Sequence, residues 1–343
     1  MNRPPPGQEN AETDRPGLVL RIVLILGAPR SGTTWLAKIF DSHPDVLYRH
    51  EPDTVLRATD LPWACSRADI PLHLDDARAY LAELIGTATV KTAGSLPMFP
   101  KRYENLPVRL LRHALVYALR AAALNRHGYR LGRTVPVPDM LDPARHRKLR
   151  VVIKSVGSLG RAGLFAAALP QAKVVLIVRD AWGQIASVRR GVALGKFDGA
   201  LPIAELVDPQ RATRYGLTLA QFATLPEVEQ LAWNWAILNE KAIDDLGGLD
   251  RVMVLRYQDL CEHPEQQARE LLAFAGLSWE PQTEAFLRRS TNHAGPDRYY
   301  AVFRATSATP DRWRQDLSPE DQRRIHAVVR ATSLAALCPE FNG

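Results

Sequence analysis

Cysteine is scarce in this chain of 343 residues. The three cysteines are odd in number and far apart in the sequence, so neither a disulfide framework nor a zinc site is indicated. They are Cys65, Cys261 and Cys338. We therefore expect a protein of the reducing cytoplasm, and we expect it to hold no metal.

Long apolar runs and targeting segments are also missing. Residues 1–17 are rich in proline and polar side chains, which predicts a disordered tail and not a signal peptide. The apolar run 18–28 is too short to cross a bilayer and contains Arg21, so we interpret it as a buried strand. We expect residues 18–343 to form a single domain.

The charge balance is basic, with 44 lysines and arginines against 37 aspartates and glutamates and a net charge of +7. Such a balance favours anionic ligands in general. The basic residues are scattered, and neither an aromatic RNA-binding signature nor a Cys/His finger accompanies them. We therefore expect an anionic small-molecule ligand and no nucleic-acid partner.

A turn bounded by two glycines follows the first apolar run. Residues 27–36 read GAPRSGTTWL, and a strand that leads through such a turn into a helix directs backbone N–H groups at an anion. A nucleotide-hydrolysing phosphate loop carries a lysine where this chain has Thr33, and here Arg30 is the only cation in the turn. The sequence predicts a phosphate-binding loop without triphosphate chemistry.

Other short apolar runs, each flanked by helix-like stretches, lie at 151–154, 173–178 and 251–256. Their alternation with helices predicts an α/β protein of the three-layer, P-loop type, with a central, mostly parallel sheet flanked by helices. The ligand should lie beyond the carboxyl ends of the strands. Residues 61–150 have a helical pattern, and we interpret them as an insertion that shapes the acceptor site.

Four segments together resemble the sulfotransferase family that uses 3′-phosphoadenosine 5′-phosphosulfate (PAPS) as donor, and in particular its carbohydrate-type members. The segments are 29–36, 177–188, 255–261 and 312–318. The resemblance implies that the first binds the 5′-phosphosulfate and the second the 3′-phosphate. It also implies transfer of a sulfuryl group to a small-molecule or glycan acceptor without a metal.

Sulfuryl transfer builds negative charge on the leaving phosphate and on the sulfuryl oxygens, so donors fixed in advance around these oxygens are its main catalytic resource. The loop supplies the Arg30 guanidinium, the backbone N–H groups from Ser31 through Gly32 to Thr34, and the hydroxyls of Thr33 and Thr34. We therefore predict that Arg30 both binds the donor and contributes to catalysis.

The second segment carries Arg179 directly after a strand and Ser187 eight residues later. If Asp180 begins a helix, the two side chains lie about two turns apart and converge on one phosphate. The alternative is that Arg179 pairs with Asp180 and that Ser187 is an ordinary helix serine. Arg304 is a further candidate cation for the 3′-phosphate.

Three other residues are assigned by the resemblance. Trp35 stacks on adenine, unless it is a core tryptophan, and Tyr257 touches adenine from the last strand. Lys154 lies near the transferred group, where a cation would stabilise developing charge, unless it is a surface lysine at a strand edge.

The acceptor hydroxyl needs a general base. Small-molecule sulfotransferases use a histidine in a Lys-Thr-His stretch, but residues 154–156 here read Lys-Ser-Val. Carbohydrate-type members place a glutamate shortly after the first helix, and Glu51 occupies that position. We predict that Glu51 is the base; the alternative is a solvated carboxylate or an ion-pair partner of Arg49 or Arg57.

The local pattern places Glu51 at the end of a strand. Residues 48–50 should form a short strand beside the first one, and Pro52 should force the chain out of it. His50 is the second candidate base because imidazole titrates near neutrality. Alternation along a strand predicts that its side chain points away from that of Glu51.

Residues 107–120 form an amphipathic pattern with arginines at 109, 112 and 120. Such a helix can lie on a membrane, but we favour one face in the core and the other in water. Two other functions stay open: a P-loop kinase, which needs the missing lysine, and a non-catalytic 3′,5′-bisphosphate-binding protein, which needs no Glu51. The acceptor, O- versus N-sulfation and the oligomeric state stay open as well.

Overall fold

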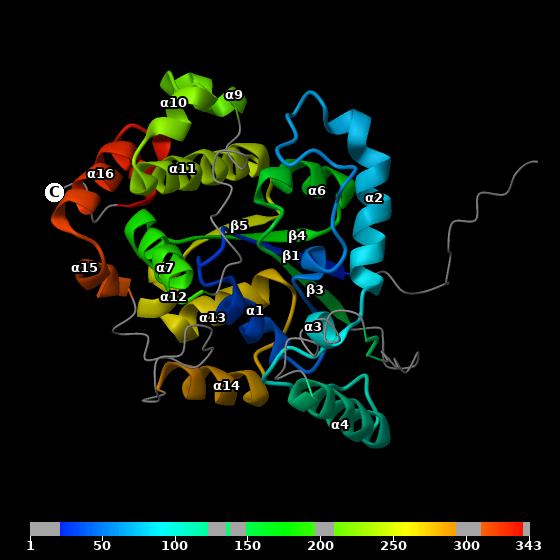
Figure 1. Ribbon diagram of the computed structural model, residues 1–343. Helices are drawn as coiled ribbons and strands as arrows, with labels where there is room; N and C mark the ends of the chain where they lie inside the picture. Colours follow the sequence, from blue (N-terminus) through cyan, green and yellow to red (C-terminus); the bar gives the residue numbers. More distant parts are fainter. Residues whose placement is uncertain (1–20, 123–134, 138–148, 196–208, 293–309, 339–343) are drawn as a thin grey trace, which may run out of the picture.

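The computed structural model describes residues 21–122, 135–137, 149–195, 209–292 and 310–338 (Figure 1). The expected tail at 1–17 and the candidate cation Arg304 lie outside the described residues. No helix in the described part of the chain is both long and apolar enough to cross a membrane.

A five-stranded sheet runs through the middle of the molecule, and all its pairings are parallel, in the order β2-β3-β1-β4-β5. Every predicted strand is present. The strands are β1 (Arg21–Leu26), β2 (Val46–His50), β3 (Arg150–Ser155), β4 (Lys173–Val178) and β5 (Val252–Arg256).

The prediction that residues 48–50 lie beside the first strand is wrong, because β3 separates β2 from β1. The segment Val151–Ile153 is apolar and buried throughout, which suits an interior strand of a parallel sheet. In β2, Arg49 and His50 are polar, and this strand takes the edge.

Helices cover both faces of the sheet, which confirms the three-layer α/β fold (Figure 1). One face carries α1 (Thr33–Asp41), α12 (Tyr257–Glu262), α13 (Pro264–Phe274) and α14 (Pro281–Thr291). The other carries α2 (Ile70–Gly86), α6 (Ala162–Ala168), α7 (Ala181–Ala193), α11 (Glu227–Leu246) and α16 (Pro319–Arg330). Shorter or peripheral helices are α3 (Val90–Ala93), α4 (Leu106–Ala122), α9 (Pro209–Ala212), α10 (Leu219–Thr224) and α15 (Trp313–Asp316).

Strand alternation divides the core into two clusters. In β1, Leu24 and Leu26 pack toward α6, α7 and α11, whereas Val23 and Ile25 pack toward α1 and α13. Because both faces of each interior strand are covered, the strands read as continuous apolar runs and not as alternating ones.

The segment expected to form a helical insertion divides into two parts. Helix α2 packs against α6 and buries Ala77, Leu81 and Leu84 in the larger core, so it belongs to a helical layer of the sheet. Helix α3 packs against β2, and α4 packs against α3. Helix α3 therefore connects α4 to β2, the strand that leads to Glu51.

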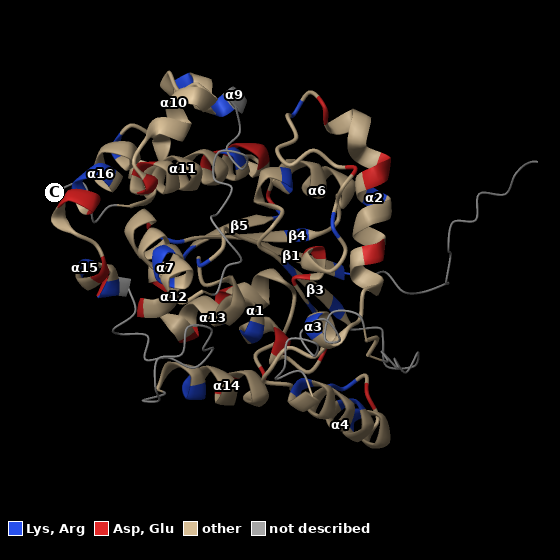
Figure 2. Ribbon diagram, in the orientation of Figure 1, with Lys and Arg blue, Asp and Glu red and all other residues tan. Residues whose placement is uncertain are grey.

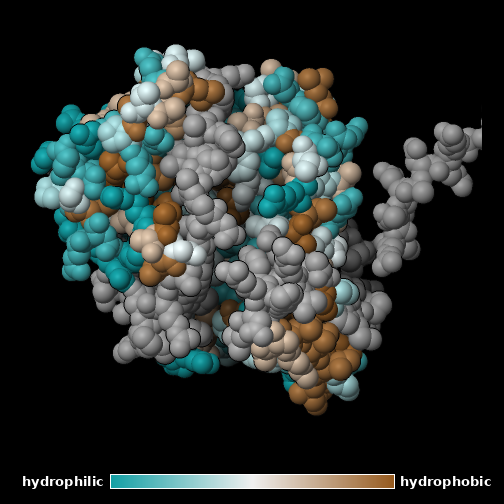
Figure 3. Space-filling model, viewed as in Figure 1, coloured by the Kyte–Doolittle hydropathy of each residue, from teal (hydrophilic) through white to brown (hydrophobic). Residues whose placement is uncertain are grey.

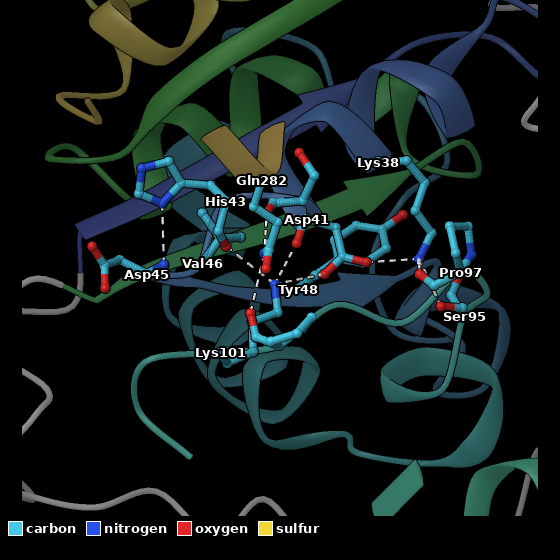
Figure 4. Close-up of polar contacts among 12 residues, drawn as sticks. Lys38, Asp41, His43, Asp45, Val46, Tyr48, Ser95, Pro97, Lys101 and Gln282 are labelled. Carbon is cyan, nitrogen blue, oxygen red and sulfur yellow. Dashed lines mark hydrogen bonds and ion pairs between the residues drawn. The ribbon is translucent and has the colours of Figure 1, made fainter. Parts of the chain in front are cut away.

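Three buried charged side chains, the ion trio Lys38, Asp41 and Lys101, join α1 to the segment before α4 (Figure 4). The Asp41 carboxylate lies 2.6 Å from Lys38 Nζ and 3.0 Å from Lys101 Nζ. Lys38 also donates to the carbonyl oxygens of Ser95 and Pro97. Burial acts to raise the pKa of Asp41, but the charges of Lys101 and Lys38 outweigh it and lower the pKa.

We predict that Asp41→Asn lowers the free energy of unfolding by about 3–5 kcal/mol, because two buried ammonium groups lose their counter-charge. Since the folded pKa of Asp41 lies below 3.8, the trio stabilises the wild type above that pH, and this stabilisation is lost on acidification through the folded pKa. Urea denaturation at neutral pH measures the change. The control is Asp75→Asn, which breaks the exposed pair with Arg78. Equal losses in both variants would contradict this account.

Candidate functional site

The candidate site lies at the edge of the sheet where the parallel strands end. Glu51 follows β2, Lys154 is the second-last residue of β3, and Arg179 follows β4. The glycine turn follows β1, and Tyr257 begins α12 directly after β5. Because parallel strands share one carboxyl edge, residues far apart in the sequence meet there.

The turn after β1 has the backbone of an anion-binding loop. Arg30 and Gly32 have positive φ angles, 73° and 89°, so N–H groups on either side of them point to a common side. The N–H of Ser31 is engaged inside the turn, where it donates to the carbonyl of Ala28 at 3.1 Å. Of the backbone donors predicted from Ser31 to Thr34, those from Gly32 to Thr34 therefore remain for an anion. They lie at the start of α1, where no preceding helical turn supplies carbonyl acceptors.

Both glycines of the loop are required by close contacts. A Cβ on Gly27 would lie 2.8 Å from the Ile177 carbonyl oxygen, and one on Gly32 would lie 2.3 Å from a ring carbon of Tyr257. The loop thus sits directly against β4 on one side and against the start of α12 on the other.

The two predicted phosphate-binding segments are joined by hydrogen bonds. Arg30 Nε donates to Ser187 Oγ at 3.0 Å, and Arg179 Nη1 donates to the carbonyl oxygen of Arg30 at 3.3 Å. Helix α7 begins as expected, since the Asp180 side chain accepts the N–H of Gly183 at 2.6 Å. The structure therefore brings Arg30, Arg179 and Ser187 into one cluster.

Arg179 has binding capacity left. Its Nε is buried and has no hydrogen-bond acceptor within the described residues, but it forms an ion pair with the Asp180 carboxylate at 3.8 Å, as the alternative expects. The guanidinium lies over the Tyr257 ring at 4.8 Å. A buried donor without an acceptor is costly, so an anionic ligand group would fit this position.

Trp35 is buried in the smaller core, and its indole N–H donates to Ser290 Oγ at 3.0 Å. This placement is that of a core tryptophan. Tyr257 lies at the start of a helix and not in the last strand, but it borders the loop. Contacts of these two residues with adenine stay predictions.

Lys154 is fully buried, which rules out the alternative of a surface lysine. Its Nζ donates to Thr34 Oγ1 at 3.0 Å and to Glu51 Oε1 at 2.5 Å. The chain Thr34–Lys154–Glu51 links the phosphate loop to the predicted base through two hydrogen bonds.

Glu51 leaves the strand abruptly, with a positive φ of 45°. Its ion-pair partners are Lys154 and Lys91, the latter at 3.7 Å from Oε2, and not Arg49 or Arg57. Burial acts to raise the pKa of Glu51, but the charge of Lys154 and its hydrogen bond outweigh it and lower the pKa to about 2. The carboxylate is therefore ionised at neutral pH.

His50 does not point away from Glu51 as strand alternation predicts. It is in register with Lys154, and register partners on neighbouring strands share a face, so His50 and the Glu51 carboxylate both approach Lys154. The alternation rule fails because Glu51 is already outside the strand. Burial lowers the pKa of His50 well below 6.5, and its Nδ1 lies 2.8 Å from the hydroxyl oxygen of Tyr48.

Two residues of the site were not predicted from the sequence. Asp53 binds the turn after β3 through Ser155 Oγ at 2.5 Å and the N–H of Gly157 at 3.2 Å. Its Oδ1 is buried without a hydrogen-bond partner in the described regions, and burial raises its pKa. Lys91, in α3, reaches Glu51 from the other side. The only sequence signal was the position of Asp53 two residues after Glu51.

Known proteins resemble this chain along most of its length. Residues 23–281 match the model of the sulfotransferase family. Human carbohydrate sulfotransferase 5 is 26% identical over 338 residues, which cover 90% of this chain and 72% of that protein. Nodulation protein NoeE of Sinorhizobium fredii is 23% identical over 331 residues, which cover 92% of this chain and 65% of that protein.

Solved structures were also compared. A sulfotransferase domain from the curacin biosynthetic pathway has a TM-score of 0.44 at 16% identity, covering 91% of this chain and 98% of that one. Mouse sulfotransferase SULT7A1 complexed with PAP has a TM-score of 0.43 at 12% identity, covering 93% and 88%. The described residues contain no group of three or more His, Cys, Asp or Glu side chains placed to hold a metal ion.

Proposed function

The chain belongs to the sulfotransferase family and is a PAPS-dependent enzyme, and we propose that it transfers the sulfuryl group to a carbohydrate hydroxyl with Glu51 as general base. The observation that carries the assignment of the base is the hydrogen-bonded chain Thr34–Lys154–Glu51. In this chain the Glu51 carboxylate is two hydrogen bonds from Thr34, a residue of the loop that we propose holds the phosphosulfate.

The proposed reaction is an in-line displacement. The acceptor oxygen attacks sulfur, the bond from sulfur to the bridging phosphate oxygen breaks, and the hydroxyl proton goes to Glu51. Adenosine 3′,5′-bisphosphate (PAP) leaves. Arg30 and the loop N–H groups offset the charge on the 5′-phosphate, while Arg179 and Ser187 hold the 3′-phosphate.

Lys154 has two roles in this proposal. Without donor it neutralises Glu51 and keeps the pKa of that carboxyl near 2. When the phosphosulfate binds, the ammonium group turns from Glu51 to the oxygens around sulfur, the pKa of Glu51 rises, and the carboxylate becomes a stronger base. Binding of the donor thus prepares proton transfer.

A carbohydrate acceptor is supported by the relatives, which include carbohydrate sulfotransferases from human, mouse and zebrafish. The position of Glu51 adds to this, because the histidine of small-molecule members is replaced by Val156. A panel of glycans, hydroxylated lipids and amines incubated with radiolabelled PAPS tests the proposal. Labelling of glycans supports it; labelling of amines or of non-sugar hydroxyls alone would contradict the acceptor, and PAP binding without labelling of any class would support the non-catalytic alternative.

Gly32→Ala is expected to weaken PAP binding by roughly 10- to 100-fold, because the new methyl group must displace Tyr257 in addition to straining a positive φ angle of 89°. Isothermal titration calorimetry with PAP measures the loss. Gly216→Ala is the matched control, since Gly216 also has a positive φ angle, 69°, but open space around its Cβ position. Equal affinities of the two variants would show that the contact with Tyr257 is unimportant.

A further inference from the structure

Helix α4 has an exposed face made of apolar side chains. Leu106, Leu110, Leu111 and Tyr117 are between 52% and 63% exposed. Their spacing places them on one side of the helix, and the space-filling view shows them as a continuous apolar area at the lower right (Figure 3). Large solvent-exposed apolar areas mark interaction sites in soluble proteins.

Two arginines of α4 point the other way. Arg112 is buried and pairs with Glu104 at 2.8 Å, and Arg120 Nε donates to the carbonyl of Gly94 at 2.8 Å. One face of α4 lies in the core, where Val116 is fully buried, and the other lies in water, as expected, but the face in water is apolar. The exposed positions carry only leucine, proline, alanine and tyrosine: 106, 107, 110, 111, 114, 117, 118, 121 and 122.

The charge of α4 indicates what covers this face. The arginine beside this face is Arg109, since Arg112 and Arg120 bind Glu104 and Gly94 on the other side, and the helix Leu106–Ala122 contains no aspartate or glutamate (Figure 2). A second α4 helix packed on this face would therefore offer Arg109 no acidic partner, which disfavours self-association. An anionic lipid surface offers the opposite charge together with an apolar layer for the leucines.

We propose that α4 docks the protein on a membrane surface that contains anionic phospholipid, with the face of Leu106, Leu110, Leu111 and Tyr117 inserted among the acyl chains. Arg109 lies at the side of this face and contacts lipid phosphate. Since α4 packs on α3 and Lys91 of α3 reaches Glu51, the docked helix lies next to the catalytic edge of the sheet.

Co-sedimentation with vesicles tests the proposal. Wild-type protein is incubated with vesicles of phosphatidylcholine alone and of phosphatidylcholine mixed with phosphatidylglycerol. We expect it to bind the mixed vesicles more strongly, and we expect the double variant Leu110→Glu, Leu111→Glu to lower that partition by about tenfold or more. The control variant Leu72→Glu, Leu219→Glu changes two leucines that are 75% and 44% exposed elsewhere on the surface, and it should bind as wild type does.

Three results would overturn the proposal: no binding of wild type to mixed vesicles, equal binding by the α4 variant, or equal loss in the control variant. Light scattering without vesicles tests whether a second copy of the chain covers this face instead. A wild-type dimer that the α4 variant converts to a monomer would assign the face to a second copy of the chain. PAP affinity, measured on the same samples, should be unchanged in both variants, so failure here is separate from failure of the proposed function.

Discussion

Glu51→Gln is expected to lower kcat for sulfuryl transfer by roughly 10²- to 10⁴-fold, the usual contribution of a positioned general base. The amide keeps the size of the side chain, and its oxygen can still accept the hydrogen bond from Lys154. The loop and the cluster of Arg30, Arg179 and Ser187 are untouched, so the affinity for PAP should stay near that of wild type. Steady-state kinetics with a labelled acceptor and calorimetry with PAP measure the two quantities.

His50→Asn is the matched variant for this experiment. Its imidazole shares a face with Lys154, and a pKa well below 6.5 would leave it neutral and able to take a proton. If His50→Asn abolishes transfer and Glu51→Gln does not, histidine is the base. The reverse pattern is our expectation. Retention of full activity by both variants would mean that neither side chain accepts the proton.

The sequence sufficed to predict the five strands and several residues at their carboxyl ends. The phosphate loop could be predicted from the spacing of Gly27 and Gly32 between an apolar run and a helix. Arg179 and Lys154 could be placed because each stands at the end of an apolar run, and parallel strands end at one edge. These inferences depend only on local pattern and on a general rule of topology.

The features that were mispredicted or missed depend on contacts between distant segments. The order of the strands depends on which apolar run is buried on both faces. In the sequence β3 follows β2 by about a hundred residues, yet it lies between β2 and β1 in the sheet. Lys91 reaches Glu51 from a short helix whose sequence carries no motif. The pattern of α4 shows that the helix is amphipathic, but not which side faces the protein, because that depends on pairing with Glu104 and Gly94.

Glu51 also leaves the strand with a backbone conformation that strand periodicity does not describe. Its φ of 45° is sparsely populated by residues other than glycine. Non-glycine residues in such conformations persist where surrounding contacts fix them, and they cluster at functional sites. Here the N–H of Glu51 donates to the Lys154 carbonyl at 2.9 Å, and Thr54 Oγ1 donates to the Glu51 carbonyl at 2.7 Å. The strain directs the carboxylate to Lys154.

Lys154→Met should lower kcat by roughly 10²- to 10³-fold, because the variant removes the buried cation that we propose stabilises the transferred group while keeping a side chain of similar length. It should also move the acid limb of the pH profile of kcat/KM for PAPS, which reports the enzyme before the donor binds. In wild type without donor, the pKa of Glu51 lies at about 2, so the carboxylate stays ionised through the whole practical range. Without Lys154, burial acts against a weaker opposing charge, and the pKa rises.

Activity of the Lys154→Met variant should therefore be lost at a higher pH than that of wild type, as Glu51 becomes protonated on acidification. Lys173→Met is the control. Lys173 is the first residue of β4, so it lies at the amino ends of the strands, away from the site, and it donates to the carbonyl of Phe274. It should leave kcat and the pH profile unchanged. An unshifted acid limb in a folded Lys154→Met protein would show that Lys154 does not set the basicity of Glu51, and a simple charge-stabilising role at sulfur would then account for any loss of rate.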